Sequence, residues 1–231
     1  RQRQMCIRDS LKYIPLPGGD AGIKRPYRVA LAHLWAAGIP WEADLPCVAA
    51  CPPDEQRVLR RQLERRLNSP LTSSAGRLFD AVAALIGVRQ VITYEAQAAI
   101  ELEALCDQDE PGRYPFTLED ADVLVLDPAP MLRAIVDDLR AGVRCERIAA
   151  KVHNTLAKII VEVSILLRAR SGVKVVALSG GVFQNVTLLR QARAQLRAAG
   201  FRVLTHQAVP PNDGGLALGQ AVIGACMSGA W

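Results

Sequence analysis

Aromatic residues and histidine are scarce in this 231-residue chain: aromatics make up 5% of it, and there are three histidines. No apolar run reaches the ~20 residues that a membrane-spanning helix needs, and no charged-then-apolar signal pattern opens the chain. We therefore expect a cytoplasmic protein that makes no contact with a membrane.

Paired cysteines are also absent. The six cysteines form no CxxC motif, and their spacing is irregular. A chain of this length does not need disulfides for its stability, so we expect free thiols in a reducing compartment. Cys47 and Cys51 could contribute to a metal site, but no second pair supports that interpretation.

The charge of the chain is positive but spread out. The net charge is +5 and the sequence pI is about 9.0. Basic residues such as Arg57, Arg61 and Arg65 recur along one helical pattern, which is typical of a solvated helix face. We therefore predict no nucleic-acid partner from charge.

The pattern of apolar residues predicts a helix-rich α/β fold. Residues 1–10 fit nothing that follows, and we interpret them as a junction or vector-derived segment; residues 11–231 form the domain. The apolar run 173–178 predicts a buried parallel strand, followed by a helix and a second strand over 201–205. A strand is also expected over 123–126. Helical patterns begin at Pro26 and cover 55–67, 76–87, 94–106, 131–139, 146–170, 188–200 and 216–226.

Two glycine turns follow the last two strands. Ser179, Gly180 and Gly181 stand where the first of these strands ends, and Asn185 comes one helical turn later. Glycines let a backbone approach phosphate oxygens closely. The pattern is neither a Walker A loop nor GxGxxG, so a simple tight turn remains an alternative. Asp213 lies in the second turn, between the strand over 201–205 and the helix over 216–226. It is either a ligand-binding carboxylate or an N-cap.

Six motifs in order resemble the C-terminal part of the HypF-type carbamoyltransferases, which mature nickel–iron hydrogenases. They include SGGVFQN and NDGGLALG, and the resemblance spans about residues 11–227. The motifs lie at 13–20, 72–80, 94–101, 153–157, 179–185 and 212–219.

The resemblance implies the second lobe of an actin/sugar-kinase-like (ASKHA) nucleotide-binding fold, akin to TsaD and TobZ. Such a domain holds ATP-derived carbamoyl-adenylate between two lobes and passes the carbamoyl group to an acceptor. In this family the acceptor is the C-terminal cysteine of the partner HypE, and carbamoyl phosphate is the carbamoyl source of the full-length protein.

The resemblance also implies roles for individual residues. Asp80 matches an acidic position that contacts ribose or substrate, although a surface carboxylate is an alternative. Asp213 matches one ligand of a divalent metal, zinc or iron, whose other ligands are two histidines. The implied nucleotide- and substrate-binding residues are Gly18, Gly19, Asp80, Ser179, Gly180, Gly181 and Asn185.

The sequence departs from the family in several respects. None of its histidines forms an HxxxH pair, and the acylphosphatase, zinc-finger and adenylate-forming domains are not in this sequence. Ala96 stands where the family has glycine. We therefore interpret the chain as a lobe of a longer protein, inactive or nearly so alone. His153 lies on the apolar side of its helix and is expected to be a hydrogen-bonded core residue.

Two other functions remain open from sequence alone. One is a TsaD-like lobe that acts in threonylcarbamoyl transfer to tRNA. The other is a nucleotide-binding scaffold without chemistry. The residues of the 72–80 and 212–219 motifs favour the carbamoyltransferase.

Overall fold

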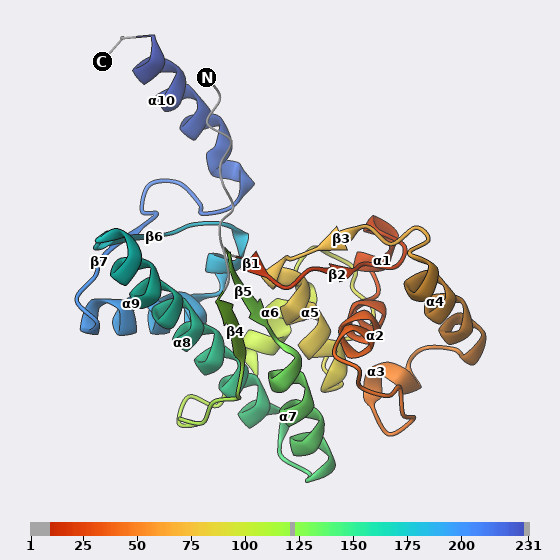
Figure 1. Cartoon of the computed structure of the whole chain (residues 1–231). Helices are drawn as coiled ribbons and strands as arrows, with labels where there is room; N and C mark the ends of the chain where they lie inside the picture. Colours follow the sequence, from red (N-terminus) through yellow and green to blue (C-terminus); the bar gives the residue numbers. More distant parts are fainter. Residues whose placement is uncertain (1–9, 121–122, 229–231) are drawn as a thin grey trace. The chain divides into compact units, whose positions relative to one another are not determined.

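The computed structural model describes residues 10–120 and 123–228. The chain divides into two compact units, Arg1–Thr155 and Leu156–Trp231, and Figure 1 labels their helices and strands. The boundary falls inside the longest helix, α8 (Cys145–Ser171). Nine of the ten residues interpreted as a junction segment lie outside the described residues, and the tenth, Ser10, begins a strand.

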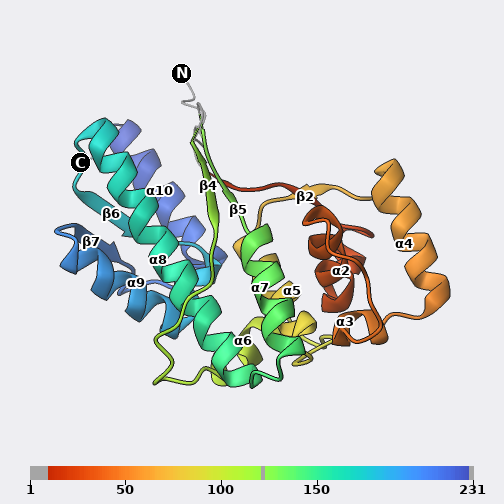
Figure 2. The ribbon, with the colours of Figure 1, turned by 60° about the horizontal axis from the view of Figure 1, so that its bottom comes forward.

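The first unit is built around two helices, α2 (Pro26–Ala36) and α5 (Ala75–Leu85). Pro26 occupies the first turn of α2, as the sequence predicts, because a proline there removes no intrahelical hydrogen bond. Ser74 caps α5 by accepting a hydrogen bond from the backbone N–H of Arg77. Figure 2 shows α2 surrounded by α3, α4, α5 and α7. This position explains why both faces of α2 are apolar.

Five further helices lie wholly in the first unit. They are α1 (Asp20–Ile23), α3 (Pro46–Ala49), α4 (Pro53–Arg65), α6 (Gln97–Ala104) and α7 (Ala129–Arg140). The bounds of α4, α6 and α7 agree with the sequence patterns within a few residues, whereas the short helices α1 and α3 were not predicted.

Two small sheets lie in the same unit. The first has the order β1-β5-β4, in which β5 (Leu124–Asp127) pairs parallel with β1 (Ser10–Leu11) and antiparallel with β4 (Thr117–Asp120). In the second, β2 (Ile14–Pro15) pairs antiparallel with β3 (Leu71–Thr72). The sequence pattern did not predict β4, because charged and polar residues fill this strand.

The second unit contains the predicted strand–helix–strand motif. Its strands β6 (Val175–Leu178) and β7 (Arg202–Thr205) are parallel, and α9 (Val186–Ala198) connects them. Short 3-10 helices, η1 (Gly181–Gln184) and η2 (Asp213–Gly215), follow the two strands, and α10 (Leu216–Met227) ends the described chain. The helix-rich α/β class is thereby confirmed.

The expectation that the strand before Ser179 is buried was wrong. Only Leu178 is buried in β6, since its sheet has two strands and α9 covers one face. The last helix, α10, has no buried residue, and Ile223 is 61% exposed. In the first unit, Ile100 on α6 is half exposed. None of the helices in the described part of the chain is long and apolar enough to cross a bilayer.

We expect Gly22→Ala to destabilise the first unit. A Cβ at this position would lie 2.4 Å from the carbonyl oxygen of Pro17, so the backbone of the turn would have to shift. The cost should be about 1–3 kcal/mol in the free energy of unfolding, measured by chemical denaturation. Ala21→Ser, at the exposed neighbouring position, is the control and should change stability by less than ~0.5 kcal/mol. Equal stabilities of the two variants would contradict the close approach.

Candidate functional site

The turn after β6 has a backbone that requires glycine at one position. Gly180 has φ 102° and ψ 156°, a region that residues with a side chain rarely adopt. Gly181 has no positive φ, and a Cβ there would meet only Cβ of Asn212, at an ordinary 3.9 Å. The two adjacent glycines therefore do different things: Gly180 makes the turn, and Gly181 leaves space in front of it.

A backbone hydrogen bond joins this turn to the second one. The N–H of Gly180 donates to the carbonyl oxygen of Pro211 over 2.8 Å. The two turns that follow the last two strands therefore lie together. The same bond uses the N–H of Gly180, so this amide is not available to a phosphate oxygen.

Local contacts shape the second turn. The side-chain oxygen of Asn212 accepts a hydrogen bond from the N–H of Gly214 over 3.1 Å. A Cβ on Gly215 would come within 2.9 Å of the carbonyl oxygen of Pro210. Asp213 lies between them and is exposed at the start of η2. The asparagine and the glycines therefore form the turn, and the carboxylate is left at its surface.

Asn185 has a structural task in the same region. Its side-chain oxygen accepts a hydrogen bond from the N–H of Leu188 over 2.8 Å and so caps α9. The role in nucleotide binding that the resemblance implies for Asn185 stays a prediction.

Sequence reasoning missed one polar contact at this site. Oγ of Ser179 lies 2.8 Å from Nε2 of His206, and both residues are exposed. Leu178 pairs with Thr205, so Ser179 and His206 are the first residues beyond two paired strand ends. Ser179 and His206 each come directly after an apolar run that predicts a strand. This shared position was the sequence signal that could have indicated the contact.

No complete metal site is present in residues 10–120 and 123–228. No three histidine, cysteine, aspartate or glutamate side chains gather there in a way that could hold an ion. Asp213 is thus at most one ligand, and the described residues do not by themselves fit a zinc or iron centre.

The candidate residues of the first unit form a separate group. Gly18 and Gly19 both have positive φ, as expected for a glycine turn. The N–H of Gly18 donates to the carbonyl oxygen of Asn68 over 2.8 Å, which holds the turn beside the paired strands β2 and β3. Ala96 also has positive φ, 61°, a backbone conformation that favours glycine.

Asp80 is buried, so the alternative of a surface carboxylate is wrong. It is 1% exposed on α5, and its Oδ2 lies 2.7 Å from Nη1 of Arg77 without the geometry of a hydrogen bond. Burial raises the pKa of Asp80 to about 6, and the positive charge of Arg77 only partly opposes this. A buried carboxyl with a raised pKa is a common feature of functional sites.

His153 is a core histidine, as predicted. It is fully buried on α8, its Nδ1 lies 2.8 Å from the carbonyl oxygen of Ala149, and its ring centroid is 5.1 Å from that of Phe79. The thiol sulfur of Cys106 lies 3.1 Å from the same nitrogen. The ring therefore fixes the end of α6 against α8.

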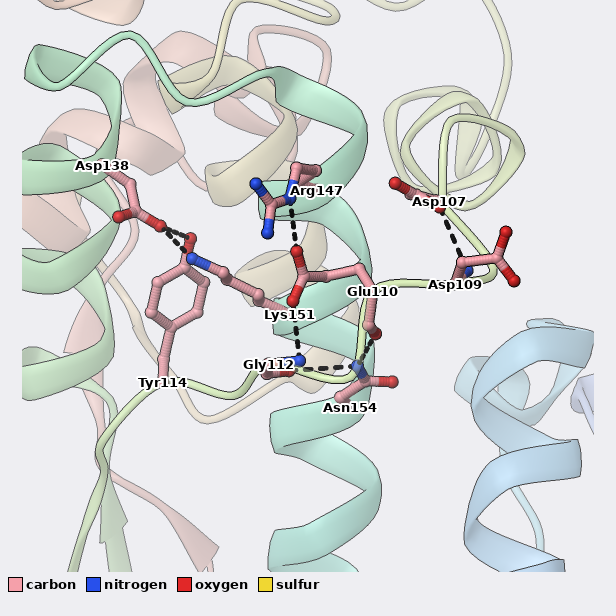
Figure 3. Close-up of polar contacts among 9 residues, drawn as sticks. All are labelled: Asp107, Asp109, Glu110, Gly112, Tyr114, Asp138, Arg147, Lys151 and Asn154. Atoms are coloured by element: carbon pink, nitrogen blue, oxygen red, sulfur yellow. Dashed lines mark hydrogen bonds and ion pairs between the residues drawn. The ribbon is translucent and has the colours of Figure 1, made fainter.

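The two residues after His153 hold a loop, part of which Figure 3 shows. Nδ2 of Asn154 donates to the carbonyl oxygens of Glu110 and Gly112, over 2.7 and 3.0 Å. The hydroxyl of Thr155 accepts a hydrogen bond from the N–H of Tyr114 over 2.8 Å. The 153–157 motif, which carried part of the family resemblance, thus has a structural role.

Charged groups complete this network. Nζ of Lys151 and the hydroxyl of Tyr114 both donate to Oδ2 of Asp138, over 2.8 and 2.7 Å (Figure 3). Burial raises the pKa of Asp138, but these two hydrogen bonds outweigh it and leave the pKa below its usual value. The pKa of Glu110 is also lowered, by the N–H of Gly112 and then by Arg147.

Comparisons with known proteins agree on one family. The family model for the second subdomain of the carbamoyltransferase Kae1-like domain matches residues 2–220. Carbamoyltransferase HypF2 of Cupriavidus necator is 37% identical over 239 residues, which cover 91% of this chain and 28% of that protein. Carbamoyltransferase HypF of Rhodobacter capsulatus is 41% identical over 221 residues, covering 93% and 27%. The chain therefore spans little more than a quarter of these relatives.

Two solved structures share the fold. One is full-length HypF in a phosphate- and nucleotide-bound form, with a TM-score of 0.89 and 40% identity; the match covers 95% of this chain and 29% of that one. The other is HypF of T. kodakarensis, with a TM-score of 0.78 and 26% identity, covering 95% and 30%.

Gly180→Ala should destabilise the second unit, because alanine is strained at a φ of 102°. We expect a loss of about 1–3 kcal/mol in the free energy of unfolding. Gly181→Ala is the matched control one residue away and should change stability by less than ~0.5 kcal/mol. If the alanine variants were equally stable in urea unfolding, the assignment of the strained position to Gly180 would be wrong.

Because of Asp80, the free energy of unfolding should fall as pH rises from about 4 to 6. The folded state holds the proton of this carboxyl with a pKa of about 6, against an ordinary value of 3.8, so folding takes up a proton between these values. Relative to Asp80→Asn, the wild type should lose on the order of 3 kcal/mol across this range. Urea unfolding of both proteins at several pH values measures the difference. Parallel pH profiles would show that the pKa of Asp80 is not raised.

Proposed function

Because the chain belongs to the HypF carbamoyltransferase family, as the second subdomain of its Kae1-like domain, we propose that it is the nucleotide-binding part of such an enzyme. The observation that carries the proposal is the turn of Ser179, Gly180 and Gly181, fixed to a second glycine turn at the ends of two parallel strands. Ligands of α/β proteins bind at this edge of a sheet. A solved structure with the same fold contains phosphate and nucleotide, which supports the same ligand here.

The reaction that we propose is carbamoyl transfer from carbamoyl-adenylate, an ATP-derived intermediate, to the C-terminal cysteine of HypE. The thiolate of HypE attacks the carbamoyl carbon, a carbon–sulfur bond forms, and AMP leaves. In the whole enzyme the carbamoyl group would come from carbamoyl phosphate. The chain's task in this step is to hold the leaving AMP by its phosphate and so to orient the carbamoyl carbon.

Three of the cysteines are unsuited to act as the nucleophile, which supports a nucleophile from a partner. Burial raises the pKa of Cys47 to about 12, that of Cys51 to about 11 and that of Cys106 to about 12. Thiolates, not thiols, are the attacking species. At neutral pH these three side chains are therefore poor nucleophiles.

The family's divalent metal is not part of the step proposed for this chain. Asp213 could supply one carboxylate ligand, and the described residues contain no group of three ligands. The chain itself contributes the turn of Ser179, Gly180 and Gly181 and the space in front of it.

Adenine nucleotide should bind the wild-type chain, and Gly181→Arg should weaken binding at least tenfold. The arginine side chain would fill the space in front of the turn, where a Cβ now meets nothing closer than 3.9 Å. Isothermal titration with AMP and with ATP measures both affinities. Gly224→Arg is the matched control, because Gly224 is an exposed position on α10, outside the 212–219 motif, with nothing within 4 Å, and its affinity should equal that of the wild type.

Equal affinities of Gly181→Arg and the wild type would contradict the position of the nucleotide. Absence of saturable binding by the wild type would contradict the proposed function of this chain. Inorganic phosphate, titrated in parallel, separates recognition of the phosphate from recognition of the nucleoside.

A further inference from the structure

The contact between Ser179 and His206 is not explained by the fold. Both side chains are exposed, and Oγ and Nε2 lie 2.8 Å apart. Water competes with a hydrogen bond at the surface, so such a contact contributes little to stability. Its position directly beside the glycine turn suggests a role in binding instead.

The strands hold the two residues in place. Leu178 and Thr205 are partners in the parallel register of β6 and β7, so the next residue of each strand lies at the same edge. Successive side chains of a strand point to opposite faces. Leu178 points into the core; Ser179 and His206 therefore come together on the other face.

The contact determines how the serine hydroxyl can act on a ligand. A hydroxyl has one proton to donate, and a neutral imidazole carries its proton on one of the two nitrogens. When Nε2 carries the proton and donates it to Oγ, the O–H of Ser179 is left to donate to another acceptor. A phosphate oxygen in front of Gly181 would be such an acceptor.

We propose that His206 is a further ligand-positioning residue: its ring holds the hydroxyl of Ser179 so that this hydroxyl donates to a phosphate oxygen of the bound nucleotide. The inference rests on the proposed function, and it adds a residue from β7 to a site otherwise made by the turn after β6. A histidine that acted as a base on Ser179 would need a third group to orient it. In the described residues the ring of His206 has no carboxylate partner, which favours positioning over nucleophilic catalysis.

Affinity for AMP, measured by isothermal titration, tests this inference. His206→Ala should weaken binding about tenfold to a hundredfold, which is the effect of one hydrogen bond to a charged group. Ser179→Ala should have an effect of similar size, and the double variant should be no weaker than either single variant, because both changes remove one shared interaction. His206→Gln should recover most of the affinity, since its amide can still donate to Oγ.

Gln207→Ala is the matched control, at the next exposed position, and should bind like the wild type. All the variants should unfold at the same urea concentration, because both partners of the contact are exposed. If His206→Ala binds as tightly as the wild type, or if the two single effects add in the double variant, the inference is wrong and the proposed function stands. If the wild type shows no saturable binding of AMP, the proposed function and this inference are both wrong.

Discussion

The hydrogen bond from the N–H of Gly180 to the carbonyl oxygen of Pro211 is the contact on which the candidate site depends. It joins the turn after β6 to the turn that carries Asp213, although about thirty residues separate them in sequence. To make this bond, Gly180 adopts a backbone conformation that a side chain would strain. Gly181 then remains open at the front of the turn, and the paired ends of β6 and β7 place Ser179 beside His206. The constraint on Gly180 thus goes with the open space at Gly181, and the pairing of the two strands produces the polar contact beside it.

The motifs shared with the family divide into two physical kinds. Residues 179–185 and 212–215 form turns at the surface, whose exposed groups suit a ligand. The 153–157 segment instead fixes a loop to α8: Asn154 and Thr155 hold its backbone, and His153 packs in the core against Phe79. Membership in a family therefore does not by itself make a motif residue a binding residue. The contacts of each side chain decide which kind it is.

Much of the fold could be predicted from sequence because local signals were strong. Pro26 and Ser74 begin helices through local effects, and the apolar run before Ser179 gives a strand. Burial was harder, because it depends on what covers an element. Val175 is 44% exposed in a two-stranded sheet, although its sequence context is typical of a buried strand. Asp80 shows the reverse case, a carboxylate inside the core next to Arg77. The role of His206 depends on the pairing of two strands, which no local pattern contains.

Backbone amide shifts of the wild-type chain during titration with AMP test the central claim most directly. If the turn after β6 binds the phosphate, the largest changes in a two-dimensional nitrogen–proton NMR spectrum should fall on residues 179–185, with a further change at His206. Saturable changes that centre on another segment, such as the arginine-bearing face of α9, would contradict this account.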